Sequence, residues 1–427
     1  MQFRAAALLL TAAATAVVAE ERVSYDGFKV FRIEAPDYIE GLHEKLEALN
    51  YVELTCGHTD HLDVAISPDD LEAFDLLSLN ATVLATDLGE DLATEGPIEE
   101  YFTPEVSALQ ARQSLPALSW FNSYRPWAEH RTFWDQLVAA APGNSRIFNV
   151  GNSFQGRQIY GFHLWGPAGQ GARPAIYFHG TVHAREWISP AVVEYIGLQL
   201  VSGWNSNDAT VRSILSKYDV YIIPFVNPDG FVYTQSTNRL WRKNRQTRTG
   251  TTCVGTDGNR NWNFQWSLPN GASTDPCSET FKGRAAGDTP EIAALTTFTN
   301  TLRTRGVKIF IDWHSFGQYI LLPFGYNCAA RATNHAQQMT IAGQHASRVG
   351  AVYNTRWTYG PSCSTLYATT GSSPDYMGGA IGAEYSWTIE LRPGPSSGSS
   401  GFVLPAGQIL ASGIEQWEGL KYVLNTV

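Results

Sequence analysis

The stretch RPAIYFHGTVHAREWISPAVVEYIGLQLV, residues 173–201, decides the fold. Its beginning, RPAIYFHG, is an apolar and aromatic run that predicts a buried strand. Its end, PAVVEYIGLQLV, predicts a buried helix, for which Ser189 and Pro190 are suited as N-cap and first residue. His183 and Glu186 lie on the loop between the two. Because ligands bind at the carboxyl ends of strands in open α/β sheets, we expect a binding site at this loop.

His183 and Glu186 are of types that bind a transition metal, since an imidazole and a carboxylate are both good ligands for Zn²⁺. Catalytic zinc usually takes three protein ligands and a water molecule, so a third ligand is expected elsewhere. His314 is the candidate, because it comes at the end of a second apolar strand, VKIFIDWHS at residues 307–315. Without a third residue, the pair would be equally consistent with two ordinary polar side chains on a loop.

The whole chain has 427 residues, 44% of them hydrophobic, which is material for a large core and more than one domain. Residues 113–427 alternate apolar strands with helical runs, and this predicts one α/β domain with a mixed central sheet flanked by helices. Further strands expected there are KYDVYIIPFV and YSWTIEL, and the expected helices include DTPEIAALTTFTNTLR and NHAQQMTIAGQHASRVGA.

The first residues, MQFRAAALLLTAAATAVVAEE, contain a basic Arg4, an apolar run and the small residue Ala19 before charges begin. This pattern is typical of a secretory signal peptide, which we place at residues 1–19. No later stretch is long and apolar enough to span a bilayer. We therefore expect a secreted, extracellular protein that acts as a monomer, with no membrane and no nucleic acid as partner.

Five cysteines fit an oxidising compartment, and the odd number leaves at least one without a partner in its own chain. Cys253 and Cys277 lie close in sequence, and Cys328 and Cys363 are a second plausible couple. Cys56 is left over. It lies in CGHTDH, whose histidines are only a weak metal signal beside a single cysteine.

Charge separates residues 20–112 from the rest of the chain. They hold 22 acidic and 5 basic residues, a net charge of −17, whereas residues 113–427 carry a net charge of +6. The first segment reads as strands and helices in the order β-α-β-β-α-β, which predicts a small α+β, ferredoxin-like unit that could dock on the second by complementary charge. A Glu-rich connector then leads to Arg112, and an exposed basic residue in such a linker is a natural proteolytic site.

Five features, in this order along the chain, resemble the zinc metallocarboxypeptidases of the pancreatic A/B type. The first is the H-x-x-E pair with its distant histidine, and the other four are NPDGFVYTQSTNRLWRKNR, CVGTDGNRNWNF, STLYATTGSSPDY and YSWTIELR. The resemblance covers about residues 118–425, and the acidic segment before it resembles the family's activation domain. It implies a secreted precursor that an activating protease cleaves, with residues 20–112 inhibiting an exopeptidase that removes C-terminal amino acids from peptides and proteins.

The resemblance also implies the catalytic groups of such an enzyme. Asp257 in TDGNRN matches a residue that accepts a hydrogen bond from the free nitrogen of the first metal ligand. Glu390 in TIELR matches the general base, which takes a proton from a zinc-activated water. Arg242 in RLWRK matches the cation that stabilises the oxyanion. The implied ligands of one zinc ion per chain are His183, Glu186 and His314.

Asn259 and Arg260 in GNRN match the family's clamp on the free C-terminal carboxylate, which a guanidinium binds through paired hydrogen bonds. Tyr367 in LYATT matches the tyrosine that closes over the same carboxylate, and Arg185 matches a secondary arginine on the substrate path. Internal peptide bonds lack this anion, so the matches imply an exopeptidase. Taken singly, Arg242 could be a surface cation, Arg260 a structural partner and Tyr367 a core residue.

The resemblance places Pro374 at the floor of the pocket for the C-terminal side chain, where an acidic residue would select Lys and Arg. No matching wall position is charged, which implies a type A preference for aromatic and aliphatic residues. Asp375 is adjacent, and a shift of the alignment by one residue would reverse this preference. The other matching wall positions are Leu321, Gly325, Leu366, Thr369, Ser372 and Thr388.

Two other functions stay open at this point. One is an inactive relative that binds partners, although it would be expected to have lost a ligand, the base or the oxyanion arginine, and none is missing. The other is a hydrolase of peptidoglycan or of amidated peptides on a similar fold. The pairs Cys253–Cys277 and Cys328–Cys363 match disulfides of the family, whereas RPGPSSGSSGF after Glu390 is longer than its usual counterpart. The histidines without a family role, expected to be packed or solvated, are His130, His163, His179, His335 and His345.

Overall fold

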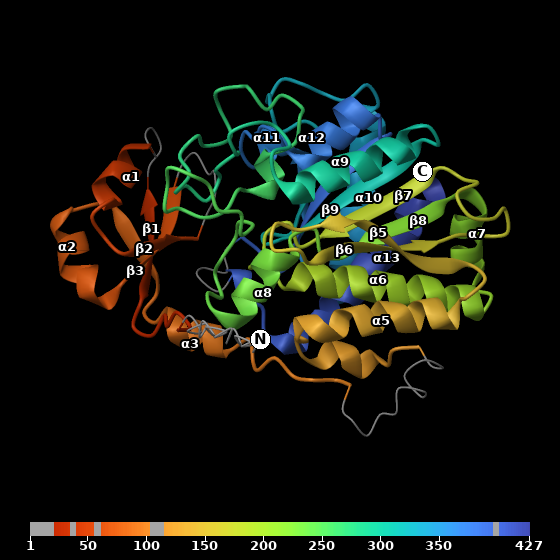
Figure 1. The fold of residues 1–427 in the computed structure, drawn as a ribbon, viewed down its shortest axis with the longest axis horizontal. Coiled ribbons are helices and arrows are strands. Elements are labelled where there is room, and N and C mark those ends of the chain that lie inside the picture. Colours follow the sequence, from red (N-terminus) through yellow and green to blue (C-terminus); the bar gives the residue numbers. More distant parts are fainter. Residues whose placement is uncertain (1–20, 35–39, 55–60, 103–114, 396–400) are drawn as a thin grey trace, which may run out of the picture.

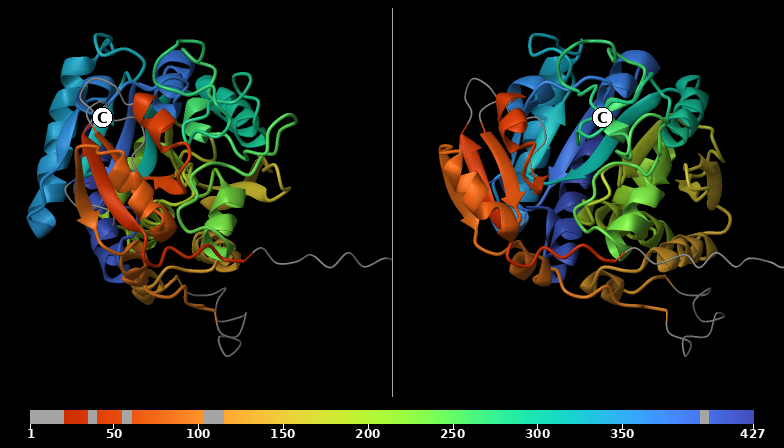
Figure 2. Two further views of the ribbon diagram at one scale, coloured as in Figure 1. Left: turned by 90° about the vertical axis from the view of Figure 1, so that its left-hand side faces the viewer. Right: turned by 60° about the vertical axis from the view of Figure 1, so that its left-hand side comes forward.

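The computed structural model describes residues 21–34, 40–54, 61–102, 115–395 and 401–427. They form a small N-terminal unit beside a larger unit (Figures 1 and 2), each with its own sheet. The predicted signal peptide, Cys56 and the predicted cleavage site at Arg112 lie outside the described residues. Within the described part of the chain, no helix combines the length and the apolar character needed to cross a bilayer.

The N-terminal unit has a four-stranded antiparallel sheet in the order β2-β3-β1-β4. Two helices complete the predicted ferredoxin-like order, and side chains such as Leu46, Val64 and Phe74 form a core between helices and sheet. The elements are β1 (Lys29–Glu34), α1 (Glu40–Leu46), β2 (Tyr51–Glu53), β3 (His61–Ile66), η1 (Pro68–Asp70), α2 (Leu71–Leu76), β4 (Ala81–Ala85) and, after the sheet, α3 (Leu88–Ala93).

The larger unit has an eight-stranded sheet in the order β11-β10-β12-β9-β7-β8-β6-β5. The central strands β12, β9, β7 and β8 are parallel, whereas β5 and β6 add to one edge in antiparallel fashion and β10 is antiparallel to β12. The predicted mixed sheet is therefore confirmed. Its strands are β5 (Ser145–Asn152), β6 (Gln158–Leu164), β7 (Ala175–Gly180), β8 (Asp219–Ile223), β9 (Val307–Ser315), β10 (Tyr319–Leu322), β11 (Thr358–Pro361) and β12 (Tyr385–Leu391).

Helices cover both faces of this sheet (Figure 1). In β7, Ile176 and Phe178 belong to one core cluster with residues of α6 and α13, whereas Ala175 and Tyr177 belong to another with residues of α9. Alternate residues of a strand point to opposite faces, so a strand covered on both sides is mostly apolar. The helices are α5 (Trp127–Ala140), α6 (Ile188–Asn205), α7 (Ala209–Lys217), α8 (Pro228–Ser236), α9 (Pro290–Arg303), α10 (His335–Tyr353), α11 (Ser362–Thr365), α12 (Ser373–Tyr376) and α13 (Ile409–Thr426).

The prediction that Ser189 caps helix α6 is wrong. The helix begins at Ile188, so Ser189 lies in its first turn. Its hydroxyl accepts a hydrogen bond from Thr181 N at 3.0 Å and donates one to Trp313 O at 2.6 Å. The side chain thus joins the loop after β7 to β9, and it is not available to cap the helix.

Two disulfides, Cys253–Cys277 and Cys328–Cys363, confirm the pairing that the sequence suggested. The first closes the segment that carries Asp257. The second joins the chain after β10 to α11, close to the segment that carries Tyr367. Both bonds therefore restrain loops on which predicted site residues lie.

Candidate active site

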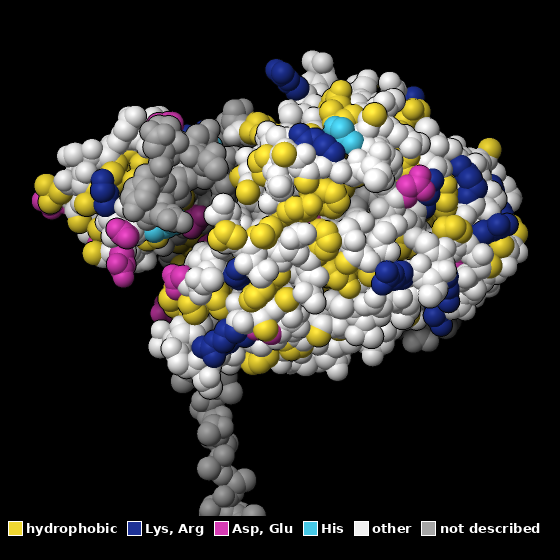
Figure 3. Space-filling model, turned by 90° about the horizontal axis from the view of Figure 1, so that it is seen from above, with side chains coloured by type: hydrophobic (Ala, Val, Ile, Leu, Met, Phe, Trp, Pro, Cys, Tyr) yellow, Lys and Arg dark blue, Asp and Glu magenta, His cyan; other side chains and the backbone are white. Residues whose placement is uncertain are grey.

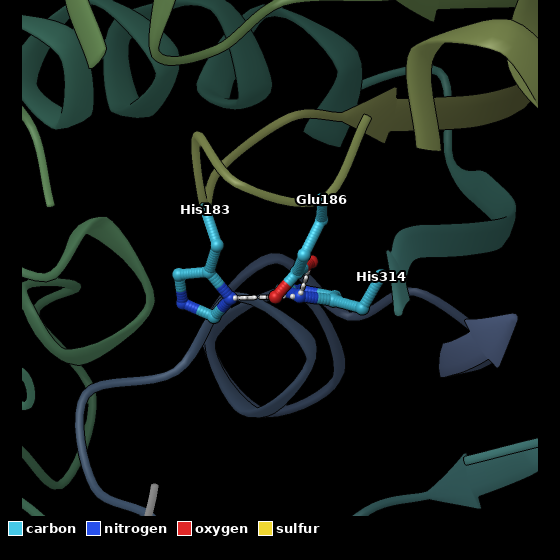
Figure 4. A group of neighbouring side chains, drawn as sticks. All are labelled: His183, Glu186 and His314. Atoms are coloured by element: carbon cyan, nitrogen blue, oxygen red, sulfur yellow. Dashed lines mark hydrogen bonds and ion pairs between the residues drawn. The ribbon is translucent and has the colours of Figure 1, made fainter. Parts of the chain in front are cut away.

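Strands β7 and β9 are parallel neighbours in the centre of the sheet, with Gly180 opposite Trp313. Because they are parallel, their carboxyl ends lie at the same edge of the sheet. The loop after β7 carries His183 and Glu186, and the end of β9 carries His314. Figure 4 shows the three side chains pointing toward one another from these two segments. The topology alone thus brings residues more than a hundred positions apart into one cluster.

The ligand atoms of this cluster face one point. His183 Nδ1 lies 2.8 Å from Glu186 Oε1, His314 Nδ1 lies 3.0 Å from Glu186 Oε2, and the two Nδ1 atoms are 3.1 Å apart. Zinc bonded at about 2.0–2.1 Å in tetrahedral geometry would separate its ligands by about 3.3 Å. The buried cluster therefore fits a zinc ion, and it is the one group of His, Cys, Asp and Glu among the described residues that could hold a metal.

Asp257 contacts the first histidine on the side away from the cluster. Its Oδ1 lies 3.1 Å from His183 Nε2, and its Oδ2 accepts a hydrogen bond from Arg242 Nη2 at 2.8 Å. Burial by itself would raise the pKa of Asp257, but the charges of Arg242 and His183 hold that pKa well below its usual range. An ionised carboxylate at this place keeps Nδ1 of His183 turned toward the other ligands.

Glu390 lies near the end of β12, which pairs with β9 so that Glu390 is opposite His314. Its side chain lines the same cavity as the cluster without belonging to it. Desolvation raises the pKa of Glu390 to about 8, against the opposing effect of His314. A carboxylate of high proton affinity beside a candidate metal site is suited to proton transfer.

The cluster opens on a cavity of about 370 Å³. Most of the site residues predicted from the sequence lie on its wall. Arg185, Asp257 and Gly325 do not, and the fully buried Arg185 instead stacks 4.0 Å over the ring of Phe402, which does line the cavity. The predicted residues on the wall are His183, Glu186, Arg242, Asn259, Arg260, His314, Leu321, Leu366, Tyr367, Thr369, Ser372, Pro374, Thr388 and Glu390.

Asn259 and Arg260 lie in the short helix η3 (Gly258–Arg260), whose N-cap is Asp257. Asn259 Oδ1 accepts a hydrogen bond from Ser373 N at 2.8 Å, which fixes the orientation of its amide. Arg260 is only 2% exposed, and its Nε has no hydrogen-bond partner among the described residues. A buried guanidinium with an available donor is suited to binding a carboxylate.

Pro374 lines the cavity and Asp375 does not, although both lie in α12. The carboxylate of Asp375 accepts hydrogen bonds from the backbone N–H groups of Gly325 at 2.9 Å and Tyr326 at 3.0 Å. These contacts hold the acidic side chain in the protein interior. Asp375, which would select Lys and Arg if it lay at the pocket floor, therefore does not face the cavity.

The N-terminal unit also contributes to the cavity wall, through residues that the sequence did not single out. Arg32 and Asp63 lie opposite each other on β1 and β3 and share two hydrogen bonds of 2.8 Å, and Leu54 lies nearby on the same wall. Opposite charges at the centre of two predicted strands are a signal that could have identified this pair, since facing residues of antiparallel strands interact. On the face shown in Figure 3, acidic side chains lie mainly on this unit and basic side chains mainly on the larger one.

A mixed α/β sheet that brings two histidines and a glutamate to one edge, with a further carboxylate beside them, is the arrangement of a metal-dependent hydrolase. A model of the family described as zinc carboxypeptidase matches residues 130–419. The chain therefore belongs to the zinc carboxypeptidase family. It is a hydrolase, and the family acts at the C-termini of peptides.

Individual relatives agree with this assignment. The metallocarboxypeptidase A-like protein of Trichophyton verrucosum is 38% identical over 422 residues, which cover 98% of both chains. The solved carboxypeptidase A of Helicoverpa armigera has a TM-score of 0.77 at 26% identity and covers 93% of this chain and 97% of its own. Thrombin activatable fibrinolysis inhibitor has a TM-score of 0.79 at 24% identity, covers 94% and 99%, and shows the fold alone. The family resemblance and the fold predicted from the sequence are confirmed.

Proposed function

We propose that the chain is secreted as an inactive precursor and, after cleavage, removes aromatic and aliphatic residues from the C-termini of peptides and proteins. Residues 1–19 are the signal peptide, 20–112 the activation domain with its connecting segment, and 113–427 the catalytic domain. One zinc ion per chain is held by His183, Glu186 and His314. The convergence of these three side chains on a cavity is the observation that carries the proposal.

Zinc, when bound, polarises the scissile carbonyl and lowers the pKa of a water molecule toward neutrality. Glu390 takes the proton of the attacking water at its carboxylate and passes it to the nitrogen of the leaving amino acid. Arg242 donates N–H groups to the oxygen that becomes negative. Its hydrogen bond to Asp257 supports this role, because a guanidinium that is already oriented needs little rearrangement when charge develops.

Specificity for a free C-terminus comes from Asn259, Arg260 and Tyr367. Their positions on one cavity wall support the assignment, and so does the Arg260 Nε that lacks a partner among the described residues. The substrate carboxylate receives paired hydrogen bonds from the guanidinium and one from the Asn259 amide. An amidated or internal peptide bond offers no such anion and leaves the buried cation without a partner.

The preference for aromatic and aliphatic side chains comes from an uncharged pocket. Pro374 forms its floor, with Leu321, Leu366 and Thr388 on the walls, and all four line the cavity. Burial of a side chain such as Phe or Leu there contributes about 1.5–3 kcal/mol. A C-terminal Lys or Arg would lose its hydration without gaining an anion.

The acidic N-terminal segment inhibits the enzyme by covering the cavity. Leu54 lies on the cavity wall, and Arg185 donates a hydrogen bond to Glu53 O at 3.0 Å. Farther along, Arg239 donates to Glu95 at 2.7 Å in a buried ion pair that joins the connector to the larger unit. A substrate C-terminus reaches the clamp once this segment is released by an activating protease, for which Arg112 is the proposed site.

Hydrolysis of N-blocked dipeptides tests this function. The protein is assayed before and after limited proteolysis, with Phe, Leu, Lys or Arg as the last residue and with the amidated Phe peptide as control. We expect only the cleaved, zinc-loaded protein to release Phe and Leu rapidly from the dipeptides that have a free C-terminus. Absence of hydrolysis of every substrate would favour an inactive relative, and equal cleavage of the amidated peptide would favour a hydrolase without a carboxylate clamp.

A further inference from the structure

Asp312, two residues before His314 on β9, is a fully buried carboxylate without a role in the mechanism above. Residues i and i+2 of a strand point to the same face, so the Asp312 and His314 side chains lie on one side of β9. Asp312 is also paired with His179 of β7 in the parallel ladder. His179 was expected from its sequence only to be packed or solvated, yet the Asp312 carboxylate lies between the two buried histidines.

Four side chains form a continuous chain of contacts here. Asp312 Oδ2 lies 2.9 Å from His314 Nε2, and Oδ1 lies 2.9 Å from His179 Nε2. On its other side, His179 Nδ1 lies 3.1 Å from the hydroxyl of Tyr177. Ser373 completes the surroundings by donating its hydroxyl to Oδ2. Neither Asp312 Oδ1 nor His179 Nε2 makes a hydrogen bond among the described residues, so their 2.9 Å contact is the closest polar approach of both atoms.

The two nitrogens of His314 therefore face different groups. Its Nδ1 points into the cluster with His183 and Glu186, whereas its Nε2 lies 2.9 Å from Asp312 Oδ2 and 3.4 Å from the amide nitrogen of Asn259. A metal-ligating histidine typically donates its other ring N–H to a carboxylate, which fixes the tautomer and the orientation of the ring. Asp257 lies in the corresponding place behind His183. Each histidine of the cluster thus has a buried carboxylate of its own.

We propose that Asp312 is a positioning residue for the metal site: held by His179 and Ser373, it orients His314 with Nδ1 toward the metal and increases zinc affinity. The proposal rests on the ligand set proposed above. An ionised carboxylate in a protein core needs a partner, and His179 would be a sufficient partner if Asp312 had only a structural role. What points to the metal site is that the second oxygen contacts the ligand histidine and is fixed there by the Ser373 hydroxyl.

The test measures zinc affinity by competition with a chromogenic chelator in the full chain and in its Asp312→Asn variant, which keeps the shape and removes the charge. Asp219→Asn is the matched control, because Asp219 is also buried and contacts a histidine, His163, at 3.0 Å on strands away from the cluster. We expect zinc binding weaker by about 10–100-fold in Asp312→Asn and unchanged in the control. The visible absorption of the cobalt-substituted protein should also change in Asp312→Asn only.

Zinc affinity equal in Asp312→Asn and the control would overturn the proposal, and a lower thermal midpoint with unchanged affinity would make Asp312 purely structural. If Asp312→Asn does not fold, His179→Leu tests the same arrangement, since it frees one carboxylate oxygen and should weaken zinc binding in the same direction. Affinity equal to wild type in that variant would count equally against the proposal. His314→Ala tests the proposed ligand set separately from the role of Asp312. Zinc binding that survives this change contradicts the ligand set itself.

Discussion

Glu390 on β12 lies directly opposite His314 on β9 in a parallel ladder. This register places a carboxylate beside a histidine of the metal cluster without making it a member of that cluster. A slip of one residue would turn Glu390 to the other face of the sheet, because side chains alternate along a strand. Glu186 faces the proposed position of the metal, whereas Glu390 stays available for proton transfer. This difference in role therefore depends on strand register.

Replacing Glu390 with Gln should leave zinc binding intact and lower kcat by roughly 10²–10⁴-fold, because an amide cannot accept the proton of the attacking water. Glu384→Gln is the matched control, since Glu384 is an exposed carboxylate paired with Lys308 away from the cavity. Zinc content and turnover of the cleaved enzyme are measured together. Turnover near wild type in Glu390→Gln would remove this residue from the mechanism, and loss of zinc would make it a ligand.

Chelation of the metal should abolish hydrolysis, and added Zn²⁺ should restore it at one zinc per chain, since the site offers three ligands and room for a water. The metal-free protein should also unfold at a lower temperature, because a ligand that binds only the folded state stabilises it. Elemental analysis accompanies each assay. Full activity in protein shown to contain no metal would contradict the zinc assignment.

Pro374→Asp should shift the preference from C-terminal Phe and Leu toward Lys and Arg, because it places an anion at the pocket floor. Asp375→Asn is the informative companion, since Asp375 binds the backbone of Gly325 and Tyr326 and does not line the cavity. It should reduce stability and leave the ratio of kcat/KM values for Phe and Arg substrates unchanged. If the unmodified enzyme releases Arg faster than Phe, the pocket assignment is wrong.

The sequence was most informative where chemistry and local pattern coincide. The H-x-x-E spacing after an apolar run and the histidine at the end of a second strand identified three residues that the structure brings within contact. The β-α-β-β-α-β order identified the N-terminal fold for the same reason, because strand and helix periods are local signals. Family resemblance added the remaining wall residues, which no local pattern connects.

What the sequence could not supply depends on register and packing. In the sequence, Asp312 is a polar residue within a largely apolar run. Its contact with His179 exists only because the register of β7 and β9 places the two residues opposite each other. The sequence predicts that Ser189 caps a helix, yet its hydroxyl hydrogen-bonds to Thr181 after β7 and to Trp313 of β9. Arg32 and Asp63 line the cavity only because one unit packs on the other. Such contacts require the three-dimensional arrangement.

Stability should depend on pH through His345, a fully buried residue of α10 that contacts Gln416 of α13. Burial lowers the pKa of His345 to about 4, although hydrogen bonds to Gln416 and Gly419 oppose this. The unfolded chain then binds the proton below about pH 6.5 and the folded chain does not, so stability is retained above that pH and lost as pH falls toward 4. The contribution is at most about 3 kcal/mol.

Urea unfolding of the full chain at several pH values measures this effect. His345→Gln should flatten the decline in unfolding free energy between pH 6.5 and 4, whatever its effect at neutral pH. His335→Gln, at the start of the same helix, is the control and should keep the wild-type slope. A decline that is equally steep in both variants would assign the pH dependence to other groups.

Cleavage of the connector should raise activity on a small substrate, because Arg32, Leu54 and Asp63 of the N-terminal unit line the cavity in the intact chain. The buried Arg239–Glu95 pair should determine how readily the cleaved segment leaves, since removing one partner of such a pair costs up to about 3–5 kcal/mol. Glu95→Gln should therefore release the segment at lower dilution, as followed by size-exclusion chromatography and by the rise of activity after proteolysis.

Glu99→Gln is the control for that experiment, because Glu99 is exposed and lies 4.0 Å from Arg125, a geometry that contributes little. It should release the segment at the wild-type dilution. Equal activity of intact and cleaved wild-type protein would contradict inhibition by the N-terminal unit. Equal release from both variants would be compatible with inhibition but would indicate that the segment is held by an apolar cluster. This cluster joins Leu240 of the larger unit to Tyr25, Phe28 and Leu88 of the N-terminal unit. Apolar attachment would weaken little with added salt, whereas attachment through the ion pair should weaken with it, so the salt dependence of release separates the two.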